Sequence, residues 1–258
     1  NQMKWMMVCK RTLGMKNIVC VKWGKKFDSS YVNKLFNAVN RNCTIFDRFI
    51  CFTDDKVGLN SKIEAFELTR SDLEICWNKL ILFEKRLYDL EGTILFFDLD
   101  VIIKDNIDDL FNYKKESNFI SIKEWYGRDY GMYLKKGFPA FNGSIMRFEM
   151  GDLYYVIDDF YKRRSHFTEE KLWDKALGYN GKVIYHDLIN LPPVVFYGDQ
   201  EWTYYILTQK NEKIEYYPSE WITSYKLSES HDNSKVVVFH GVPKPNEVDD
   251  DFVKEHWK

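Results

Sequence analysis

The sequence predicts a single α/β domain with a mostly parallel central sheet. Its 258 residues are enough for one large domain of this class. A strand, a helix and a second strand are expected within about forty residues of one another, an order typical of βα units that feed a parallel sheet. No repeat, low-complexity tract or Gly/Ser linker divides the chain.

The first βα unit opens the fold. Residues 17–23 form a largely apolar run that ends at Gly24, and we expect a buried strand there. Asp28 or Ser29 can cap the helix that follows. Residues 46–53 are the second predicted strand. The helix should bury the residues that recur at helical spacing, which are Val32, Leu35, Phe36 and Val39.

Later elements continue this alternation. Residues 77–88 predict a helix, and residues 93–97 predict a third buried strand. Further along we expect short strands at 119–122 and 144–148, helices at 153–164 and 200–208, and a last strand at 235–240. Ligands of such sheets bind beyond the carboxyl ends of the strands. The chemistry is therefore expected near Trp23, Thr53, Asp98 and His240.

The composition excludes several classes of protein. A net charge of −2 excludes a strongly basic nucleic-acid binder, and an aromatic content of 17% excludes disorder. Five cysteines without a C-x-x-C pair indicate neither a zinc site nor a disulfide framework. We therefore expect a reducing compartment, the cytoplasm. No apolar stretch reaches the ~18 residues that a membrane span needs, so no transmembrane segment is expected.

The first residues stand apart from this pattern. Trp5, Met6 and Met7 lie next to basic residues in a segment too short and too weakly apolar for a signal peptide. Met15 is followed at once by the first predicted strand and is a candidate natural start. Residues 1–14 are then an N-terminal extension that the fold does not need, and residues 15–258 are the domain.

Asp98 and Asp100 form a D-x-D pair directly after the third predicted strand. Where a strand breaks into a turn, two such carboxylates can converge on one cation. Hard oxygen ligands suit Mg²⁺ or Mn²⁺, ions that commonly bridge to substrate phosphates. The alternative is a pair of solvated aspartates at a strand end. The apolar run before Asp98 favours a site, because it fixes the pair on a rigid, buried element.

His240 ends another apolar run and is followed by Gly241 and Lys244. A neutral imidazole can complete an oxygen-rich metal site, and a lysine four residues later can reach phosphate as a point charge. Pro243 and Pro245 restrict where that charge can go. A purely structural histidine is the alternative.

Two polar turns complete the candidate residues. In Gly198-Asp199-Gln200, the aspartate and the glutamine can hydrogen-bond sugar hydroxyls. The alternative for this turn is a helix N-cap provided by Asp199. Asn142-Gly143-Ser144 is a second turn of the same kind, with a plain loop as its alternative.

The order of these motifs resembles the GT-A nucleotide-sugar glycosyltransferases, in particular the group of glycogenin and the bacterial lipopolysaccharide galactosyltransferases. The resemblance covers residues 16–248, and its most specific parts are the D-x-D pair, the G-D-Q turn and the H-G-x-x-K-P ending. It implies a single GT-A (Rossmann-like) domain. It also implies metal-dependent transfer of a sugar from a UDP-sugar to a hydroxyl of a glycan, lipid-linked or protein acceptor.

The same resemblance implies a role for each matching residue. Asp98, Asp100 and His240 would bind Mn²⁺ or Mg²⁺, while Asp199 and Gln200 would act at the reacting sugar carbon. Phe27 stands where the group commonly has tyrosine, and Gly143 replaces a serine or an alanine. The donor would be bound by Val21, Lys22, Trp23, Gly24, Phe27, Thr53, Lys79, Asp98, Leu99, Asn142, Gly241 and Lys244.

Charge indicates the mechanism. The metal and Lys244 would stabilise the negative charge that grows on the departing diphosphate. The resemblance implies retention of the anomeric configuration, with Gln200 stabilising C1. If the enzyme inverts instead, Asp199 is the candidate base. The acceptor surface is expected in residues 124–139, where the aromatic side chains include Trp125; a lid is the alternative there.

Two other functions fit parts of the sequence. Asp98-Leu99-Asp100-Val101 matches the signature of haloacid-dehalogenase-like phosphatases, in which Asp98 would be the nucleophile. That signature usually opens its domain, whereas here about ninety residues precede it, and it leaves the residues from His240 to Pro245 without a role. A non-catalytic sugar-binding protein on the same fold is the second alternative. The intact Asp98, Asp100 and His240 argue against it.

Overall fold

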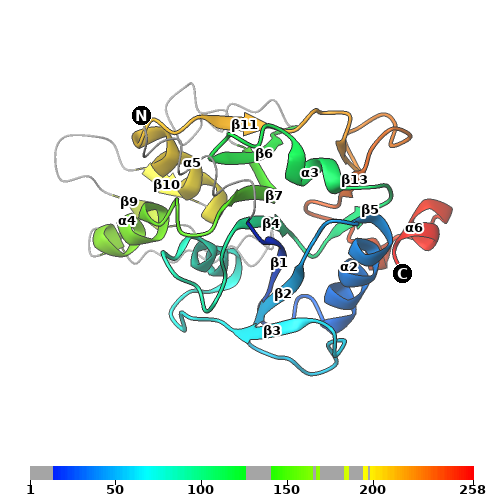
Figure 1. The fold of residues 1–258 in the computed structure, drawn as a ribbon, viewed down its shortest axis with the longest axis horizontal. Helices are drawn as coiled ribbons and strands as arrows, with labels where there is room; N and C mark the ends of the chain where they lie inside the picture. Colours follow the sequence, from blue (N-terminus) through cyan, green and yellow to red (C-terminus); the bar gives the residue numbers. More distant parts are fainter. Residues whose placement is uncertain (1–13, 126–140, 165–166, 169–182, 186–193, 197) are drawn as a thin grey trace.

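The computed structural model of the chain describes residues 14–125, 141–164, 167–168, 183–185, 194–196 and 198–258. Its centre is a seven-stranded sheet in the order β11-β6-β7-β4-β1-β2-β3 (Figure 1). The strands are β1 (Lys16–Lys22), β2 (Arg48–Thr53), β3 (Glu64–Glu67), β4 (Thr93–Phe97), β6 (Phe119–Lys123), β7 (Phe141–Glu149) and β11 (Ile214–Tyr216).

The sheet is mostly parallel, as predicted. Strand β7 runs antiparallel to both of its neighbours, β4 and β6. The pairings of β1 with β2 and β4, of β2 with β3, and of β6 with β11 are parallel. The carboxyl ends of β1, β2 and β4 therefore meet at one edge, where ligands of such sheets bind.

Two small sheets flank the central one. The first has the order β12-β13-β5 and is built from β5 (Val101–Ile103), β12 (Ile222–Ser224) and β13 (Val236–Val238). Strand β5 follows the D-x-D pair, so this sheet joins that pair to the C-terminal part of the chain. The second has the order β10-β9-β8, with β8 (Phe167–Thr168), β9 (Val183–Tyr185) and β10 (Val194–Phe196).

Helical segments cover both faces of the central sheet. Figure 1 shows α2 on one side, and α4 and α5 on the other. The helices are α2 (Ser29–Asn42), α3 (Asp108–Asn112), α4 (Tyr155–Arg163), α5 (Asp199–Gln209) and α6 (Asp251–His256), with the 3₁₀ segments η1 (Ile75–Phe83) and η4 (Pro245–Glu247). Among the described residues, no helix combines the length and the apolar character needed to cross a bilayer.

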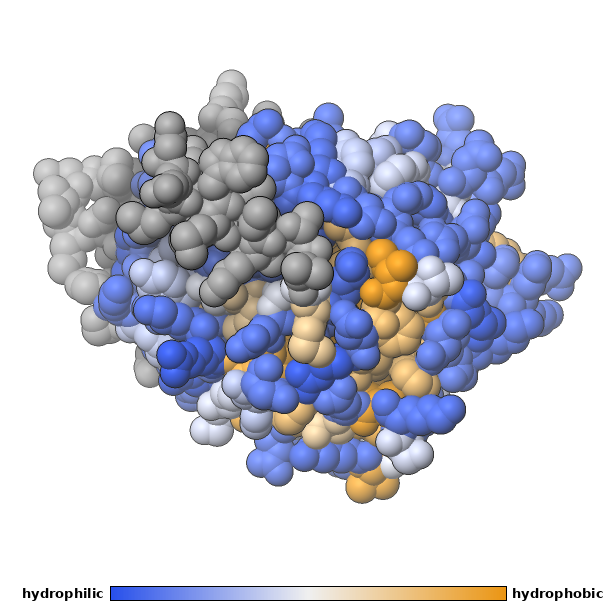
Figure 2. Space-filling model, viewed as in Figure 1, coloured by the Kyte–Doolittle hydropathy of each residue, from blue (hydrophilic) through white to orange (hydrophobic). Residues whose placement is uncertain are grey.

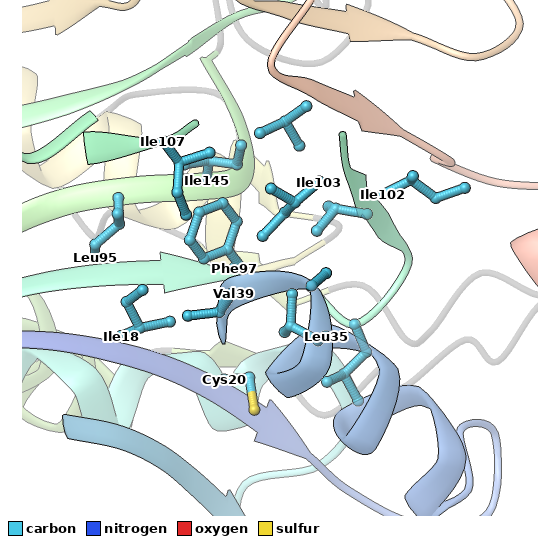
Figure 3. Close-up of a cluster of buried hydrophobic side chains, with 14 of the residues drawn as sticks. Ile18, Cys20, Leu35, Val39, Leu95, Phe97, Ile102, Ile103, Ile107 and Ile145 are labelled. Carbon is cyan, nitrogen blue, oxygen red and sulfur yellow. The ribbon is translucent and has the colours of Figure 1, made fainter. Parts of the chain in front are cut away.

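The strand residues alternate between two apolar cores, because successive side chains of a strand point to opposite faces. Ile18 and Cys20 of β1 pack with α2 and β5 in one core, which Figure 3 shows in close-up. Val19 packs in the other core, with η1, α4 and α5. Cys51 is fully buried like Cys20, as expected for a cysteine that serves as a small hydrophobe.

The first βα unit confirms the sequence-based expectation. The N–H of Ser30 donates to the Asp28 carboxylate at 2.9 Å, so Asp28 caps α2. The residues predicted to face the core are buried: Val32, Leu35, Phe36 and Val39. The extension lies almost entirely outside the described residues, so its dispensability stays a prediction.

Three elements differ from the expectation. The helix predicted at residues 77–88 is the 3₁₀ segment η1, which begins at Ile75 and ends at Phe83. It buries consecutive apolar residues from Leu80 to Phe83, and a one-sided α-helix cannot bury such a run. The strand predicted at residues 144–148 is the longer β7, which includes Asn142 and Gly143, and the strand predicted at residues 235–240 is only the three-residue β13, in a small sheet.

The surface is predominantly hydrophilic around a central apolar area in the face that Figure 2 shows. Most large apolar side chains in the described part of the chain are buried. Val57 and Val242 are the most exposed of the large hydrophobic residues there, with exposed fractions of 79% and 72%. Val242 follows Gly241, so this side chain adjoins the residues predicted to hold a diphosphate.

Candidate active site

Asp98 is fixed between β4 and β7. Strand β4 ends at Phe97, and the N–H of Asp98 donates to the carbonyl oxygen of Ser144 at 2.8 Å. The side-chain oxygen of Asn142 accepts from the N–H of Ser144 at 2.9 Å. The turn that contains Asn142 therefore belongs to a buried strand rather than to a plain loop, and it lies beside the D-x-D pair.

Lys79 joins three elements at this edge of the sheet. Its Nζ lies 2.7 Å from Asp98 Oδ1 and 3.9 Å from Asp199 Oδ2. The exposed fractions of the three side chains are 15%, 24% and 7%, so their charges interact with little screening by water. The 3₁₀ segment η1 carries the lysine, β4 leads into Asp98, and α5 begins at Asp199.

Burial shifts the acidity of this group. Burial would lower the pKa of Lys79, but the charges of Asp199 and Asp98 outweigh it and raise that pKa. Burial raises the pKa of Asp199 to about 6, against the opposing charge of Lys79. At neutral pH the lysine is therefore charged and the aspartate is mostly ionised.

Gln200 is oriented by the backbone of β7. Its amide oxygen accepts from the N–H of Gly143 at 2.9 Å. A Cβ at position 143 would lie 3.6 Å from that oxygen, which is an ordinary contact. The glycine that departs from the resembled pattern thus supplies a backbone donor, and no side chain is needed for this contact. Gly198 is the N-cap of α5, so the alternative in which Asp199 caps the helix is wrong.

Asp100 and Lys244 form a second charged group. The Lys244 ammonium is ion-paired with the Asp100 carboxylate and donates to the carbonyl oxygen of Phe239 at 3.1 Å. The N–H of Phe239 donates to the carbonyl oxygen of Asp100 at 3.0 Å, which ties the two segments together. Burial raises the pKa of Asp100, the charge of Lys244 lowers it, and the nearby Asp98 raises it. Asp98 and Asp100 are two residues apart, so the two charged groups are neighbours.

His240 is held by contacts on both its edge and its face. Its Nε2 lies 2.6 Å from the Ser224 hydroxyl, and its ring stacks on Trp125 with centroids 5.3 Å apart. Burial and the charges of Lys226 and Lys244 lower its pKa to about 4. The imidazole is therefore neutral at physiological pH, as a metal ligand must be.

The predicted metal ligands have suitable chemistry. Two carboxylates and a neutral imidazole are donors that Mn²⁺ and Mg²⁺ accept. In the described part of the chain, however, no three His, Cys, Asp or Glu side chains gather closely enough to hold a metal ion. Asp98 pairs with Lys79 and Asp100 pairs with Lys244. The ligand set of Asp98, Asp100 and His240 stays a prediction.

The ends of β1 and β2 approach each other at the predicted nucleotide site. The N–H of Gly24 donates to Asp54 Oδ2 at 2.9 Å, and Gly24 has the positive φ of 65° that glycine adopts readily. The Thr53 hydroxyl donates to the Asp55 carbonyl oxygen at 2.9 Å. Phe27 packs on Tyr31, with ring centroids 4.8 Å apart.

The remaining predicted binding residues are less available. Lys22 and Leu99 are buried, with exposed fractions of 4% and 3%, so Leu99 can offer a ligand little more than its backbone. Val21 and Trp23 are half-buried, and Gly241 is exposed with a φ of 71°. The 5.7 Å distance from Lys244 Nζ to the Phe27 ring centroid places the aromatic ring next to the second charged group. Phe27 therefore links the predicted base site to the predicted diphosphate site.

Sequence reasoning missed three residues at this site. Ser224 orients His240 from β12. Glu201 is 7% exposed in the first turn of α5, and burial raises its pKa to about 7. The sulfur of Cys76 lies 3.0 Å from the point where a Cβ of residue 198 would be, so a side chain there would crowd the sulfur. The only sequence signal was proximity, since Glu201 and Cys76 adjoin the G-D-Q turn and the segment that carries Lys79.

Comparison with known proteins supports the predicted fold. No protein-family profile matches the chain, and no curated protein matches it in sequence. A crystal structure of the galactosyltransferase LgtC with donor and acceptor sugar analogues has 15% identity and a TM-score of 0.55, covering 89% of this chain and 88% of that chain. An active-site mutant of LgtC has 13% identity and a TM-score of 0.54, with 89% of each chain covered. The chain therefore has the GT-A fold that its motifs predict.

Proposed function

We propose that the protein is a metal-dependent glycosyltransferase that moves a sugar from a UDP-sugar to an acceptor hydroxyl with retention of configuration. One observation carries the proposal. Lys79 joins Asp98 to Asp199 at the carboxyl end of the sheet, and the Asp100–Lys244 pair adjoins them. The likeness of the fold to a galactosyltransferase bound to donor and acceptor sugar analogues supports it.

The donor would lie across the ends of β1, β2 and β4. Phe27 offers an aromatic face for the base or the ribose. The strand ends would contribute further side-chain or backbone contacts to the donor, from Val21, Lys22, Trp23, Gly24, Thr53 and Leu99. Lys244 and Gly241 would hold the diphosphate, because an ammonium group and an exposed backbone N–H both bind phosphate oxygens. Asn142 would contact the donor sugar together with Lys79.

The metal would be held by Asp98, Asp100 and His240. When bound, it would neutralise charge on the departing diphosphate. Lys244 adds a positive charge at the same place, and its burial makes that charge effective. Lys79 would restrain the carboxylates of Asp98 and Asp199 through its contacts with both.

Asp199 and Gln200 would act at the transferred sugar. The hydrogen bond from the Gly143 N–H holds the Gln200 amide oxygen in place, which supports a role in positioning C1 and stabilising positive charge there. Asp199 is ionised and paired with Lys79 and would hydrogen-bond a sugar hydroxyl. In an inverting reaction Asp199 would be the base, a role that its pKa of about 6 permits.

The acceptor side is marked by Trp125. This half-buried ring stacks on His240 and ends the described part of the predicted acceptor surface, since residues 126–139 lie outside the described residues. A glycan, lipid-linked or protein acceptor would approach from that side.

The phosphatase alternative has no comparable support, because it gives no role to Lys244 or to the segment around His240.

The experiment is a thermal-shift screen of UDP-sugars with and without Mn²⁺. A ligand that binds only the native state raises its stability by RT ln(1 + [L]/Kd), so the correct donor should raise the melting temperature most. Release of UDP in the presence of an acceptor then tests turnover. Trapping a phosphoaspartate at Asp98 would instead establish the phosphatase, and binding without turnover would establish a sugar-binding protein.

A further inference from the structure

Each carboxylate of the D-x-D pair has its own ammonium partner. Asp98 Oδ1 lies 2.7 Å from Lys79 Nζ, and Asp100 Oδ2 is paired with Lys244 Nζ. The side chains of Asp100 and Lys244 are both 11% exposed. The oxygens that would bind a divalent cation are thus already compensated by positive charge from the chain itself.

We propose that Lys79 and Lys244 act as built-in counter-ions, which a nucleoside diphosphate draws away from the D-x-D carboxylates when it binds. Divalent cation and diphosphate then bind with positive cooperativity, and the cation alone binds weakly. The inference rests on the proposed function, because it assumes that Asp98 and Asp100 are cation ligands and that a diphosphate is the second ligand.

The balance of charge gives the physical reason. Asp98, Asp100 and Asp199 carry three negative charges, and the two lysines carry two positive charges. A divalent cation that arrived alone would meet two ammonium groups in a poorly screened site, and like charges at this range repel strongly. A diphosphate supplies the negative charge that makes the cation and both ammonium groups compatible. Because binding free energies are linked, each ligand must then strengthen the other by the same factor.

The two lysines are not equally free to change partner. When Lys79 leaves Asp98, Asp199 lies 3.9 Å away and can keep its charge compensated. Lys244 has the neutral carbonyl oxygen of Phe239 as its other hydrogen-bond acceptor. The ammonium of Lys244 therefore needs an incoming anion more than that of Lys79 does, and Lys244 should dominate the coupling.

The test measures Mn²⁺ binding by the electron paramagnetic resonance signal of the free ion, with and without UDP. For the wild-type protein we expect UDP to tighten Mn²⁺ binding at least about tenfold, within the usual range of coupling between sites. Lys244→Gln removes the counter-ion and keeps a polar side chain. In the absence of UDP, this variant should bind Mn²⁺ about tenfold more tightly than wild type, and most of the UDP-dependent gain should be lost.

Lys226→Gln is the matched control. Its ammonium lies close to Gly241 and acts on His240, but it makes no ion pair with a carboxylate among the described residues. It removes one positive charge at the same edge of the sheet but frees no carboxylate. A smaller change in Mn²⁺ affinity is therefore expected. Lys79→Gln frees the other carboxylate and should also tighten Mn²⁺ binding, which keeps the test decisive if Lys244→Gln does not fold.

The outcomes separate the two proposals. If wild type binds Mn²⁺ and UDP together but neither lysine variant tightens Mn²⁺ binding without UDP, the counter-ion exchange is wrong and the proposed function stands. An equal effect of Lys226→Gln and Lys244→Gln would also overturn it, because a general field effect would then suffice. If wild type binds no UDP in the presence of Mn²⁺, the proposed function itself is wrong.

Discussion

At the scale of single residues, the site depends on charges that are buried in pairs. Asp100 and Lys244 lie in the interior and satisfy each other. A buried ion pair contributes little net stability, but removal of one partner leaves the other charge uncompensated. Substitution of Asp100 is therefore expected to cost more stability than substitution of a solvent-exposed aspartate at a strand end. The stability of each variant at this position must be measured alongside its activity.

We predict that Asp100→Asn abolishes transfer and also destabilises the protein. The remaining Lys244 ammonium would be buried without a carboxylate, at a cost of about 3 kcal/mol. The double variant Asp100→Asn/Lys244→Met removes both charges and should regain most of the lost stability, yet remain inactive. Urea denaturation and a metal-dependent transfer assay measure the two effects. Full activity of Asp100→Asn would remove the central role of that carboxylate.

Glu201 should make stability depend on pH. Burial raises its pKa from 4.5 to about 7 in the folded protein. Between these values the native state keeps a proton that the unfolded state releases, so this residue lowers stability as pH rises through the window from 4.5 to 7. At the lower end of this pH window, Glu201→Gln should have the same free energy of unfolding as wild type. At pH 8 the variant should be more stable, by on the order of 3 kcal/mol.

Glu215→Gln is the control of opposite sign. Hydrogen bonds from Lys114 and Lys213 lower the pKa of Glu215, so its ionised form stabilises the fold above the unfolded-state value and loses that effect as pH falls. This variant should therefore be less stable than wild type at pH 8. Thermal melts from pH 4 to pH 8 provide the comparison. The account of Glu201 fails if Glu201→Gln melts in parallel with wild type over the whole range.

At the scale of elements, the apolar runs and the helix cap in the sequence predicted those strands and helices whose formation depends on neighbouring residues. The apolar strand β4 was predicted at residues 93–97, where it lies, and the cap and the buried face of the amphipathic helix α2 were also predicted correctly. The segment η1 was assigned as a helix of the wrong kind and length, because its burial is decided by α4 and α5, which come much later in the sequence. The tertiary setting overrode the local preference there.

Two glycines separate the cost of backbone conformation from the cost of crowding. Gly24 and Gly92 both have positive φ, 65° and 83°. A Cβ at Gly24 would meet no atom within 4 Å, whereas one at Gly92 would lie 2.3 Å from the backbone oxygen of Met15. Gly24→Ala should thus cost roughly 1–2 kcal/mol, the usual penalty of the left-handed conformation.

Gly92→Ala should cost several times as much, because it must also separate the starts of β1 and β4. Equilibrium urea denaturation of both variants measures the difference. Equal destabilisation would mean that the contact between Gly92 and Met15 contributes nothing to the junction of the two strands.

At the scale of the whole molecule, the order of strands and motifs predicted the fold and the neighbourhood of the site. The chemistry was expected near Asp98, at the carboxyl ends of the strands, and the structure places Lys79 beside Asp98 and Asp199 there. The pairing of each D-x-D carboxylate with a lysine could not be predicted. Lys244 is 144 residues from Asp100 in sequence, and only the small sheet formed by β5, β12 and β13 brings them into contact.

Transfer of a sugar with retention is recognised by the anomeric configuration of the product. The measurement is a proton NMR time course with an α-linked UDP-sugar, Mn²⁺ and an acceptor. We predict that the donor signal decays as an α-linked product appears. A β-linked product would contradict retention and make Asp199 the catalytic base. A donor signal unchanged for every UDP-sugar that stabilises the protein would contradict glycosyl transfer itself.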